Sequence, residues 1–393
     1  VNAGTVPTPV RVRATLEGSA ISTVSSNLSI AVGLPSQNNF SMSIGTFNME
    51  GYNVDGMPNT FNIIASDRLG NPVPDGTTIN FVTESGQVQS SRISATGTDG
   101  LSRAVANFQS ASPRPVDGRY TVVAYALGEE SFLDANGNNV FDEGEDYQDL
   151  GDVFIDRLYN GTYNALEDQF ISLTTGGAAA CRDATSPLLQ LGLSSPSRSR
   201  SQAGAALSTC TTGWGRAYVR RAMQGVLSTS SARPVYGTAL PSNGRVPDAA
   251  ACPKPRKLIK EIDGENHGYT TADAKIEREY YEFGSVWLAN MPKTSVISVI
   301  ASDANPVAFN PMPAGTVVTV AATKGLSATV DGGSPIANSL APTGVAIGYG
   351  FDDVTTSGTI TVSFTTPGGP NVGKLTTSFS QFVTMQDLGV PCP

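Results

Sequence analysis

The chain has 393 residues and a net charge of −9, and its length allows two to four domains. Only 15% of its residues are charged, while 41 Gly and 25 Pro favour short strands joined by turns and argue against a coiled coil, a collagen and a disordered acidic tail. The acidic balance argues against nucleic-acid binding, the single His267 excludes a multi-histidine metal site, and no apolar run is long enough for a membrane-spanning helix.

Residues 1–34 are predicted to contain two strands. Residues 9–16 alternate apolar and polar side chains, and residues 22–32 resemble a closing strand before a linker at 33–39. Two strands are too few for a stable sheet. We expect either the terminal strands of an incomplete upstream domain, removed by truncation or processing, or donor strands that complete the sheet of a neighbouring subunit.

Residues 35–128 are predicted to form a β-sandwich domain. Partial alternation at 60–66, 76–83 and 119–126 indicates strands, and turn-rich clusters at 67–75 and 97–100 separate them. Strands at this spacing are typical of a sandwich.

Residues 129–170 concentrate the negative charge of the chain. Twelve Asp and Glu residues lie between Glu129 and Asp168, and only Arg157 opposes them, so this segment carries −11. Carboxylates at this density repel one another unless water or a cation neutralises them.

The spacing of these acids predicts a calcium loop of the EF-hand type. The oxygen ligands at positions 1, 3, 5, 7, 9 and 12 of the loop are expected from Asp134, Asn136, Asn138, Val140, Asp142 and Glu145, with Val140 using its backbone carbonyl. Asn139 replaces the usual Gly at position 6, where Asn is the next-best residue for a left-handed backbone. Phe141 is expected to pin the loop to a neighbouring element.

A second, weaker copy of this pattern follows. Its expected calcium ligands are Asp156, Asn160, Thr162, Asn164 and Glu167. Leu158 occupies the position of the third ligand, and Asp149 and Asp152 are candidates to complete either site. The alternative is an acidic loop that is simply solvated.

Residues 171–290 are predicted to be an inserted region that contains cysteines. An even count of cysteines without a CxxC pair favours two disulfides in an oxidising compartment, formed by Cys181, Cys210, Cys252 and Cys392. Three connectivities are possible, of which we favour Cys181–Cys210 with Cys252–Cys392; four buried thiols are the alternative. The mixed charges at 270–282 predict a short helix.

An internal repeat predicts a second sandwich at 291–386, followed by a tail at 387–393. The segments at 64–67 and 72–77 recur at 300–303 and 311–316, and each copy leads into a β-rich run and then a glycine, Gly86 or Gly325. The fold class predicted is therefore all-β, with tandem sandwiches and an acidic segment between them.

The first copy, IIASDRLGNPVPDGTTINFVTESG at 63–86, resembles the bacterial immunoglobulin-like repeats of the invasin and intimin type. This resemblance implies tandem domains on the surface of a Gram-negative bacterium, some with calcium loops between them, and an extracellular role without catalysis. The segment at 218–221 and the residues after it resemble the first strand of the next repeat.

Three classes of function remain after this reading. The first is a calcium-stabilised structural array, a surface stalk or a self-associating filament subunit. The second is an adhesin module that binds a glycan or protein through loop tips. The third, an enzyme, is disfavoured, because the clustered carboxylates have ligand spacing and no nucleophile–base pair is visible.

Overall fold

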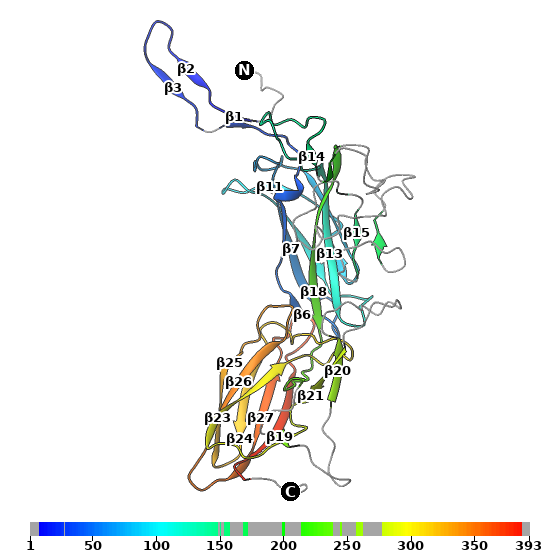
Figure 1. Ribbon diagram of the computed structural model, residues 1–393, viewed down its shortest axis with the longest axis vertical. Coiled ribbons are helices and arrows are strands. Elements are labelled where there is room, and N and C mark those ends of the chain that lie inside the picture. Colours follow the sequence, from blue (N-terminus) through cyan, green and yellow to red (C-terminus); the bar gives the residue numbers. More distant parts are fainter. Residues whose placement is uncertain are drawn as a thin grey trace.

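The computed structural model of the chain describes residues 8–26, 28–147, 150, 153–157, 168–171, 199–200, 214–238, 244–245, 257–261 and 277–386. Within these ranges the regular structure is β-strand, apart from a single 3-10 turn, η1 (Gln37–Asn39). The all-β fold predicted from the sequence is therefore confirmed. Two elongated bodies lie end to end, and a narrow hairpin projects beyond the first of them (Figure 1). No helix in the described part of the chain is long and apolar enough to cross a bilayer.

The first body, called sandwich 1 below, consists of two sheets that enclose one core. One sheet has the order β10-β8-β13-β18-β6, with β10 (Ser91–Ile93), β8 (Thr78–Thr83), β13 (Arg119–Glu129), β18 (Arg216–Ser228) and β6 (Asn48–Glu50). The other has the order β11-β12-β7-β5, with β11 (Ala95–Thr96), β12 (Ser102–Gln109), β7 (Pro58–Ala65) and β5 (Phe40–Ile44), and β9 (Gln87–Val88) pairs with β12.

Alternation of side chains along each strand produces the core of sandwich 1. In β7, Phe61, Ile63 and Ala65 are fully buried, while the residues between them are only partly covered. Phe108 of one sheet stacks on Tyr120 of the other, with ring centroids 4.8 Å apart and an interplanar angle of 12°. Burial of side chains of this size contributes about 1.5–3 kcal/mol each to folding.

The second body, sandwich 2, repeats this architecture. One sheet has the order β19-β22-β28-β27-β24, with β19 (Gly244–Arg245), β22 (Trp287–Leu288), β28 (Thr376–Thr384), β27 (Ser357–Thr365) and β24 (Val317–Ala322). The opposite sheet has the order β23-β26-β25, with β23 (Thr294–Ala301), β26 (Thr343–Phe351) and β25 (Leu326–Gly332). Phe283, Val299, Ile347 and Phe364 lie in its core.

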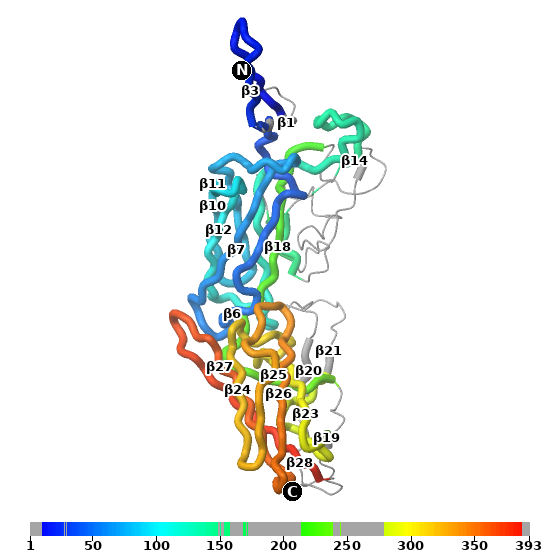
Figure 2. Tube along the Cα trace, turned by 90° about the vertical axis from the view of Figure 1, so that its left-hand side faces the viewer, coloured from blue at the N-terminus to red at the C-terminus, as the bar shows by residue number. Residues whose placement is uncertain are grey.

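Five two-stranded elements complete the described structure. The N-terminal hairpin contains the pairs β1 (Thr8–Val10) with β4 (Leu28–Ile30) and β2 (Arg13–Thr15) with β3 (Ser22–Val24). The other pairs are β14 (Asp146–Tyr147) with β17 (Ser199–Arg200), β15 (Phe154–Ile155) with β16 (Gln169–Phe170), and β20 (Lys257–Glu261) with β21 (Glu277–Tyr281). Figure 2 shows the hairpin and β14 at one end of the molecule and β28 at the other.

Two segments differ from the sequence predictions. The strand expected to open the next repeat at 218–221 belongs to β18, which pairs antiparallel with β13 along all eleven residues of that strand and closes sandwich 1. Strand propensity identifies such a segment as a strand but does not identify its partner. The helix predicted at 270–282 is wrong for β21, because the backbone of β21 pairs with β20.

The internal repeat found in the sequence corresponds to a repeated turn. Thr77 Oγ1 donates a hydrogen bond to the carbonyl of Pro74 at 2.7 Å, and Thr316 Oγ1 donates to the carbonyl of Pro313 at the same distance. The turn positions β8 in sandwich 1 and β24 in sandwich 2 at equivalent places.

A buried polar network joins the two sandwiches. Asn48 in β6 is completely buried, and its Nδ2 donates to the carbonyls of Met312 and Ala337 at 2.7 and 3.0 Å. Its Oδ1 accepts the backbone N–H of Ser339 at 3.0 Å. All polar atoms of this side chain therefore serve the contact between sandwiches.

Arg119, at the start of β13, extends the same joint. Its Nε donates to Oδ1 of Asn310 at 3.1 Å, and its Nη2 donates to the carbonyl of Leu340 at 3.2 Å. Asn310 in turn donates to the carbonyl of Asp117, and Asn305 donates to the carbonyl of Val116. Since Asn305 and Asn310 are fully buried, their side-chain N–H groups pair with sandwich 1 and not with water.

Candidate functional site

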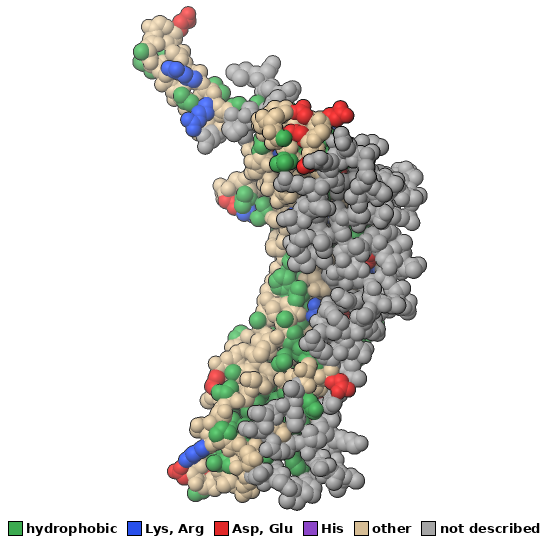
Figure 3. Space-filling model, in the orientation of Figure 1, with side chains coloured by type: hydrophobic (Ala, Val, Ile, Leu, Met, Phe, Trp, Pro, Cys, Tyr) green, Lys and Arg blue, Asp and Glu red, His purple; other side chains and the backbone are tan. Residues whose placement is uncertain are grey.

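The acidic loop lies at the end of sandwich 1 that faces away from sandwich 2. Strand β13 runs from the joint at Arg119 to Glu129 at the opposite end, where the loop begins, and β18 returns along it. Figure 3 shows acidic side chains gathered at this end, beside the start of the hairpin. The segment expected between the two sandwiches thus flanks the junction between the hairpin and sandwich 1.

Asp134 organises the first half of the loop. Its Oδ1 accepts the backbone N–H groups of Gly137 and Asn138 at 2.7 and 3.1 Å, and its Oδ2 accepts that of Asn139 at 2.7 Å. Asn139 has a φ of 60°, the left-handed conformation expected at the sixth loop position. The replacement of Gly by Asn therefore leaves the turn intact.

The expected amide ligands converge on one carboxylate. Nδ2 of Asn136 and Nδ2 of Asn138 donate to the same oxygen of Asp142, at 2.6 and 2.7 Å. Oδ1 of Asn138 accepts the backbone N–H of Val140 at 2.8 Å. The N–H groups of these two amides, and not their oxygens, therefore face Asp142.

Glu145 closes the loop from its last position. Its side chain is buried, Oε1 accepts the backbone N–H of Ala135 at 2.8 Å, and Oε2 accepts that of Asp142 at 2.9 Å. Both carboxylate oxygens therefore face the loop, as a bidentate ligand requires. Within the described residues, no three Asp, Glu, His or Cys side chains form a group that could hold a metal ion.

Aromatic side chains attach this loop to sandwich 1. Phe141 stacks on Trp214 with ring centroids 5.1 Å apart, and it meets Phe132 and Tyr147 edge-on at 5.7 and 5.9 Å. Trp214 Nε1 donates to the carbonyl of Glu130 at 2.7 Å. The anchoring role predicted for Phe141 is confirmed, whereas Trp214, which lies far away in the sequence, was not predicted.

Arg68 is a second residue that sequence reasoning missed. It follows Asp67 in the repeat turn, and its Nη1 donates to Oε1 of Glu129 at 2.7 Å while Nη2 donates to the carbonyl of Asn139. The guanidinium also lies 5.1 Å from the ring centroid of Phe132. Burial raises the pKa of Glu129, and Arg68 partly offsets this effect. Arg68 thus connects the turn at Asn139 to Glu129 at the end of β13.

A small cavity separates the loop from the linker that leads to the hairpin. It has a volume of about 260 Å³, and its lining includes Ser36, Arg68, Ser131 and Asp134. The Oγ atoms of Ser36 and Ser131 lie 3.3 Å apart, and the backbone N–H of Glu129 donates to the carbonyl of Pro35 at 3.1 Å. The loop and the linker are therefore held against each other.

The second predicted calcium loop lies mostly outside the described residues. Asp156 is buried, and the backbone N–H of Arg157 donates to Oδ1 of Asp168 at 2.9 Å. The other expected ligands and the nearby acids, Asn160, Thr162, Asn164, Glu167, Asp149 and Asp152, are outside the described ranges. The same holds for His267 and for the four cysteines Cys181, Cys210, Cys252 and Cys392, so the disulfides stay a prediction.

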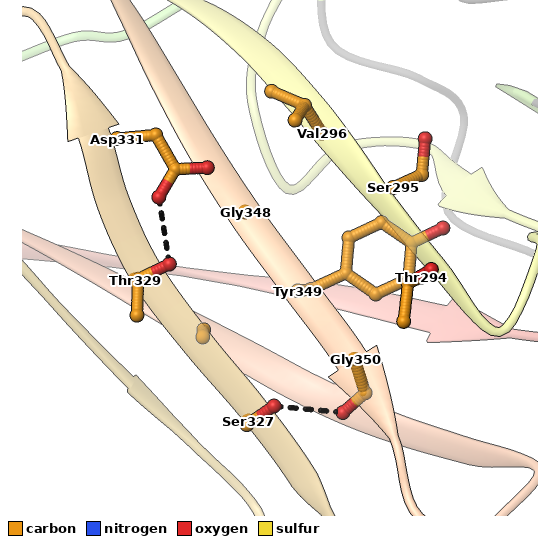
Figure 4. Close-up of a pocket in the computed structure, with 10 residues that line it drawn as sticks. Thr294, Ser295, Val296, Ser327, Thr329, Asp331, Gly348, Tyr349 and Gly350 are labelled. Carbon is orange, nitrogen blue, oxygen red and sulfur yellow. Dashed lines mark hydrogen bonds between the residues drawn. The ribbon is translucent and has the colours of Figure 1, made fainter.

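A shallow, open trough runs along the outer face of the three-stranded sheet in sandwich 2 (Figure 4). Its floor is the backbone of β26 at Gly348 and Gly350, and its volume is about 430 Å³. Asp331 leans over Gly348 and accepts a hydrogen bond from Thr329 Oγ1 at 2.7 Å. The trough presents hydroxyl groups and one carboxylate, which are groups that hydrogen-bond sugars or peptide backbones.

No family model matches the chain, and no curated protein matches it. Among solved structures, the chain is similar to the adhesin InvE of Yersinia pseudotuberculosis, with 10% identity and a TM-score of 0.21 over 89% of this chain. The match spans 60% of the length of that adhesin. A similarity of this size assigns neither activity nor partner to this chain.

Proposed function

We propose that the chain is a non-enzymatic, extracellular structural module that forms part of a surface stalk or a self-associating filament, with calcium at its N-terminal junction. The buried polar joint between the sandwiches is the observation that carries this proposal. Asn48, Arg119 and Asn310 supply directional hydrogen bonds across it. Breaking one of them leaves a buried polar group unpaired, at a cost of about 1–3 kcal/mol.

Such a joint suits a spacer whose task is to hold a fixed length and direction. A hinge would leave the facing surfaces hydrated and would place few buried polar atoms between them. Here side chains and backbone from several turns of sandwich 2 meet β6 and the start of β13. We therefore expect the two sandwiches to move as one rod.

Calcium is the ion that the first loop supports best. Its carboxylate, amide and carbonyl oxygens are hard ligands, and the left-handed Asn139 and the inward Glu145 reproduce the turn and the closing ligand of such loops. When bound, the ion would offset the repulsion of the −11 segment. Extracellular modules of this type bind calcium at about 10⁻⁴–10⁻³ M.

Small-angle X-ray scattering of the purified chain tests the structural role. The proposal expects a profile that a single end-to-end arrangement of the sandwiches fits, and a broad distribution of interdomain angles would contradict it. Electron microscopy of the native material tests filament formation, since regular fibres with a repeat set by this module support it and isolated particles argue against it.

An adhesin module is the second candidate, and the trough on sandwich 2 favours it. Asp331, Thr329 and Ser327 face open solvent along the floor formed by β26 (Figure 4). A glycan array, with Asp331→Ala as the variant, separates the two functions. A signal that this variant abolishes supports recognition, and an array without signal leaves the structural role as the better account.

A further inference from the structure

The N-terminal hairpin exposes an apolar face. Leu16 and Ile21 are 61% and 68% exposed, and Val12 and Leu28 are 43% and 44% exposed. A hairpin of this length does not fold stably by itself in water. The exposed face therefore requires an explanation.

The strand register shows which side chains share that face. Ala14 pairs with Thr23, and the backbone N–H of Leu16 donates to the carbonyl of Ile21, so these residues lie on one side. Arg13 pairs with Val24 and lies on the other side. Val12 shares the side of Ala14 and Leu16, because side chains alternate along a strand.

The linker after the hairpin contacts sandwich 1 as the linker after β18 contacts sandwich 2. The backbone N–H of Val32 donates to Oδ2 of Asp67 at 2.9 Å, and the backbone N–H of Thr229 donates to Oδ2 of Asp303 at 2.7 Å. Asp67 and Asp303 occupy the same position in the two copies of the repeat. Both carboxylates are fully buried.

A second pair of hydrogen bonds repeats four residues later. The backbone N–H of Ser36 donates to the carbonyl of Ser66 at 3.0 Å, and that of Arg233 donates to the carbonyl of Ser302 at 2.8 Å. The interface between a closing strand and the following sandwich is thus already present at residues 32–36. It continues directly into the hairpin.

This equivalence aligns the hairpin with β13 and β18. The pair Val10 and Leu28 corresponds to the pair Tyr120 and Gly225, because Ile30 and Leu227 each precede the anchored linker residue by two. The core-facing residues of β13 are Tyr120, Val122, Ala124 and Ala126, and all four are fully buried. Their counterparts in the hairpin are Val10, Val12, Ala14 and Leu16.

We propose that residues 8–30 are the closing hairpin of a third sandwich, and that their apolar face docks on the body of a β-sandwich of the same repeat type carried on the N-terminal side of Thr8. The body would supply a β8-like strand beside the first hairpin strand, as β8 lies beside β13, and its core residues would cover Val12, Ala14 and Leu16.

The acidic loop occupies the place in sandwich 1 that corresponds to a turn of sandwich 2 at the joint between the two sandwiches. In sandwich 2, the turn between β27 and β28 contacts sandwich 1, where the backbone N–H of Gly368 donates to Oε2 of Glu50 at 3.2 Å and Asn371 Nδ2 donates to the carbonyl of Asp55 at 3.2 Å. The equivalent connection in sandwich 1, between β13 and β18, contains the acidic loop. The loop would therefore lie at the new joint.

Photo-crosslinking of the protein isolated from the cells that make it tests this proposal. A photoreactive phenylalanine is placed at position 12 on the apolar face or, as the matched control, at position 24 on the opposite face. We expect crosslinks from position 12 to a sandwich body N-terminal to Thr8 in the same polypeptide, and about tenfold fewer from position 24, which faces solvent. Crosslinks from position 12 to a second hairpin, a lipid or an unrelated protein would overturn it, as would equal labelling or none.

Hydrogen exchange supplies a readout that does not depend on crosslinking. Backbone amides of residues 8–30 should exchange about 100-fold more slowly in the native protein than in the 393-residue chain alone. Val12→Asp should abolish this protection and Val24→Asp should keep it, while both leave sandwiches 1 and 2 folded. Equal exchange in the two samples, or equal effects of the two substitutions, contradicts the proposal. Neither measurement depends on calcium. The proposal of a third sandwich can therefore fail while the proposed structural role of the chain still holds.

Discussion

Arg119 and Glu129 lie at opposite ends of strand β13, and their side chains contact different parts of the same chain. Arg119 donates to Asn310 of sandwich 2, whereas Glu129 accepts from Arg68 beside the acidic loop. Ten residues of extended chain separate them by about 33 Å. Strand β13 is thus the mechanical link between the two ends of sandwich 1.

At the joint, Arg119→Ala should loosen the contact between the sandwiches. The change removes the hydrogen bonds to Asn310 and Leu340 and leaves the buried side-chain oxygen of Asn310 without this donor, at a cost of about 1–3 kcal/mol. Spin-label distance measurements between the sandwiches should show a broader distribution. Arg92→Ala, on an exposed position of β10, is the control, and an unchanged distribution in Arg119→Ala would refute the role given to this residue.

At the other end, calcium should raise the melting temperature of the chain, and a chelator should reverse the effect. Binding to the folded form at ten times the dissociation constant adds about 1.4 kcal/mol of stability. Asp142→Ala and Glu145→Gln should remove the response, whereas Glu143→Gln, an exposed acid of the same loop outside the ligand positions, should keep it. Calorimetry measures all three, and identical melting with and without calcium in the unsubstituted chain would disprove the site.

Arg68→Ala should free the acidic loop without unfolding sandwich 1. It removes hydrogen bonds to both Glu129 and Asn139, so the loop loses its tie to the repeat turn. We expect faster proteolysis within residues 134–145 and calcium binding weakened by about tenfold, equivalent to about 1.4 kcal/mol. Arg68→Lys retains the charge but cannot make both hydrogen bonds in the same geometry. Its proteolysis rate and calcium affinity should therefore lie between those of the unsubstituted chain and those of Arg68→Ala. Unaltered proteolysis in Arg68→Ala would contradict this assignment.

The stability of sandwich 1 should fall as pH rises toward 8. Burial, reinforced by Asp117, raises the pKa of Glu84 from 4.5 to about 8, so the folded chain holds a proton there that the unfolded chain releases above pH 4.5. The protonated Glu84 therefore contributes fully to the free energy of unfolding below pH 4.5, and this contribution is lost as the pH rises through 8. Each unit of difference between the folded and unfolded pKa is worth about 1.4 kcal/mol. Urea unfolding of Glu84→Gln should show a flatter pH profile between 5 and 8, with exposed Glu17→Gln as the control. A parallel decline in Glu84→Gln would exclude Glu84 as the cause.

Gly86→Ala should destabilise sandwich 1 far more than Gly100→Ala. Both glycines have positive φ, 70° and 78°, so both substitutions carry backbone strain. An added Cβ at Gly86 would lie 2.4 Å from the ring of Phe108, while at Gly100 it meets nothing within 4 Å. Chemical denaturation should therefore show an extra loss of about 1–3 kcal/mol for Gly86→Ala, and equal losses would show that the ring contact is unimportant.

Local sequence patterns predicted several of the strands correctly. The strands predicted at 60–66, 76–83 and 119–126 correspond to β7, β8 and β13, because side-chain alternation and turn residues act over a few neighbours. The partner of β18 was beyond such reasoning. It pairs with β13 across the long connection at 130–215, and nothing in its own sequence encodes that register.

In the candidate site, too, the residues within the loop could be predicted and those from distant segments could not. The left-handed Asn139 and the anchoring Phe141 followed from fixed spacing within a loop. Arg68 and Trp214 reach the loop from distant segments and carry no motif, so only the folded chain shows their contacts. The joint was missed for the same reason, since Asn48 and Asn310 are ordinary polar residues until the sandwiches meet.

The anchoring of each linker by Asp67 and Asp303 has an evolutionary consequence. The carboxylates accept backbone N–H groups, which every residue except proline provides, so the side chains of the linker are free to drift. Duplication or loss of a whole sandwich with its linker would therefore leave the contact between the carboxylate and the backbone N–H group unchanged. Each added or removed copy of the repeat would therefore bring its own carboxylate acceptor to the same backbone contact.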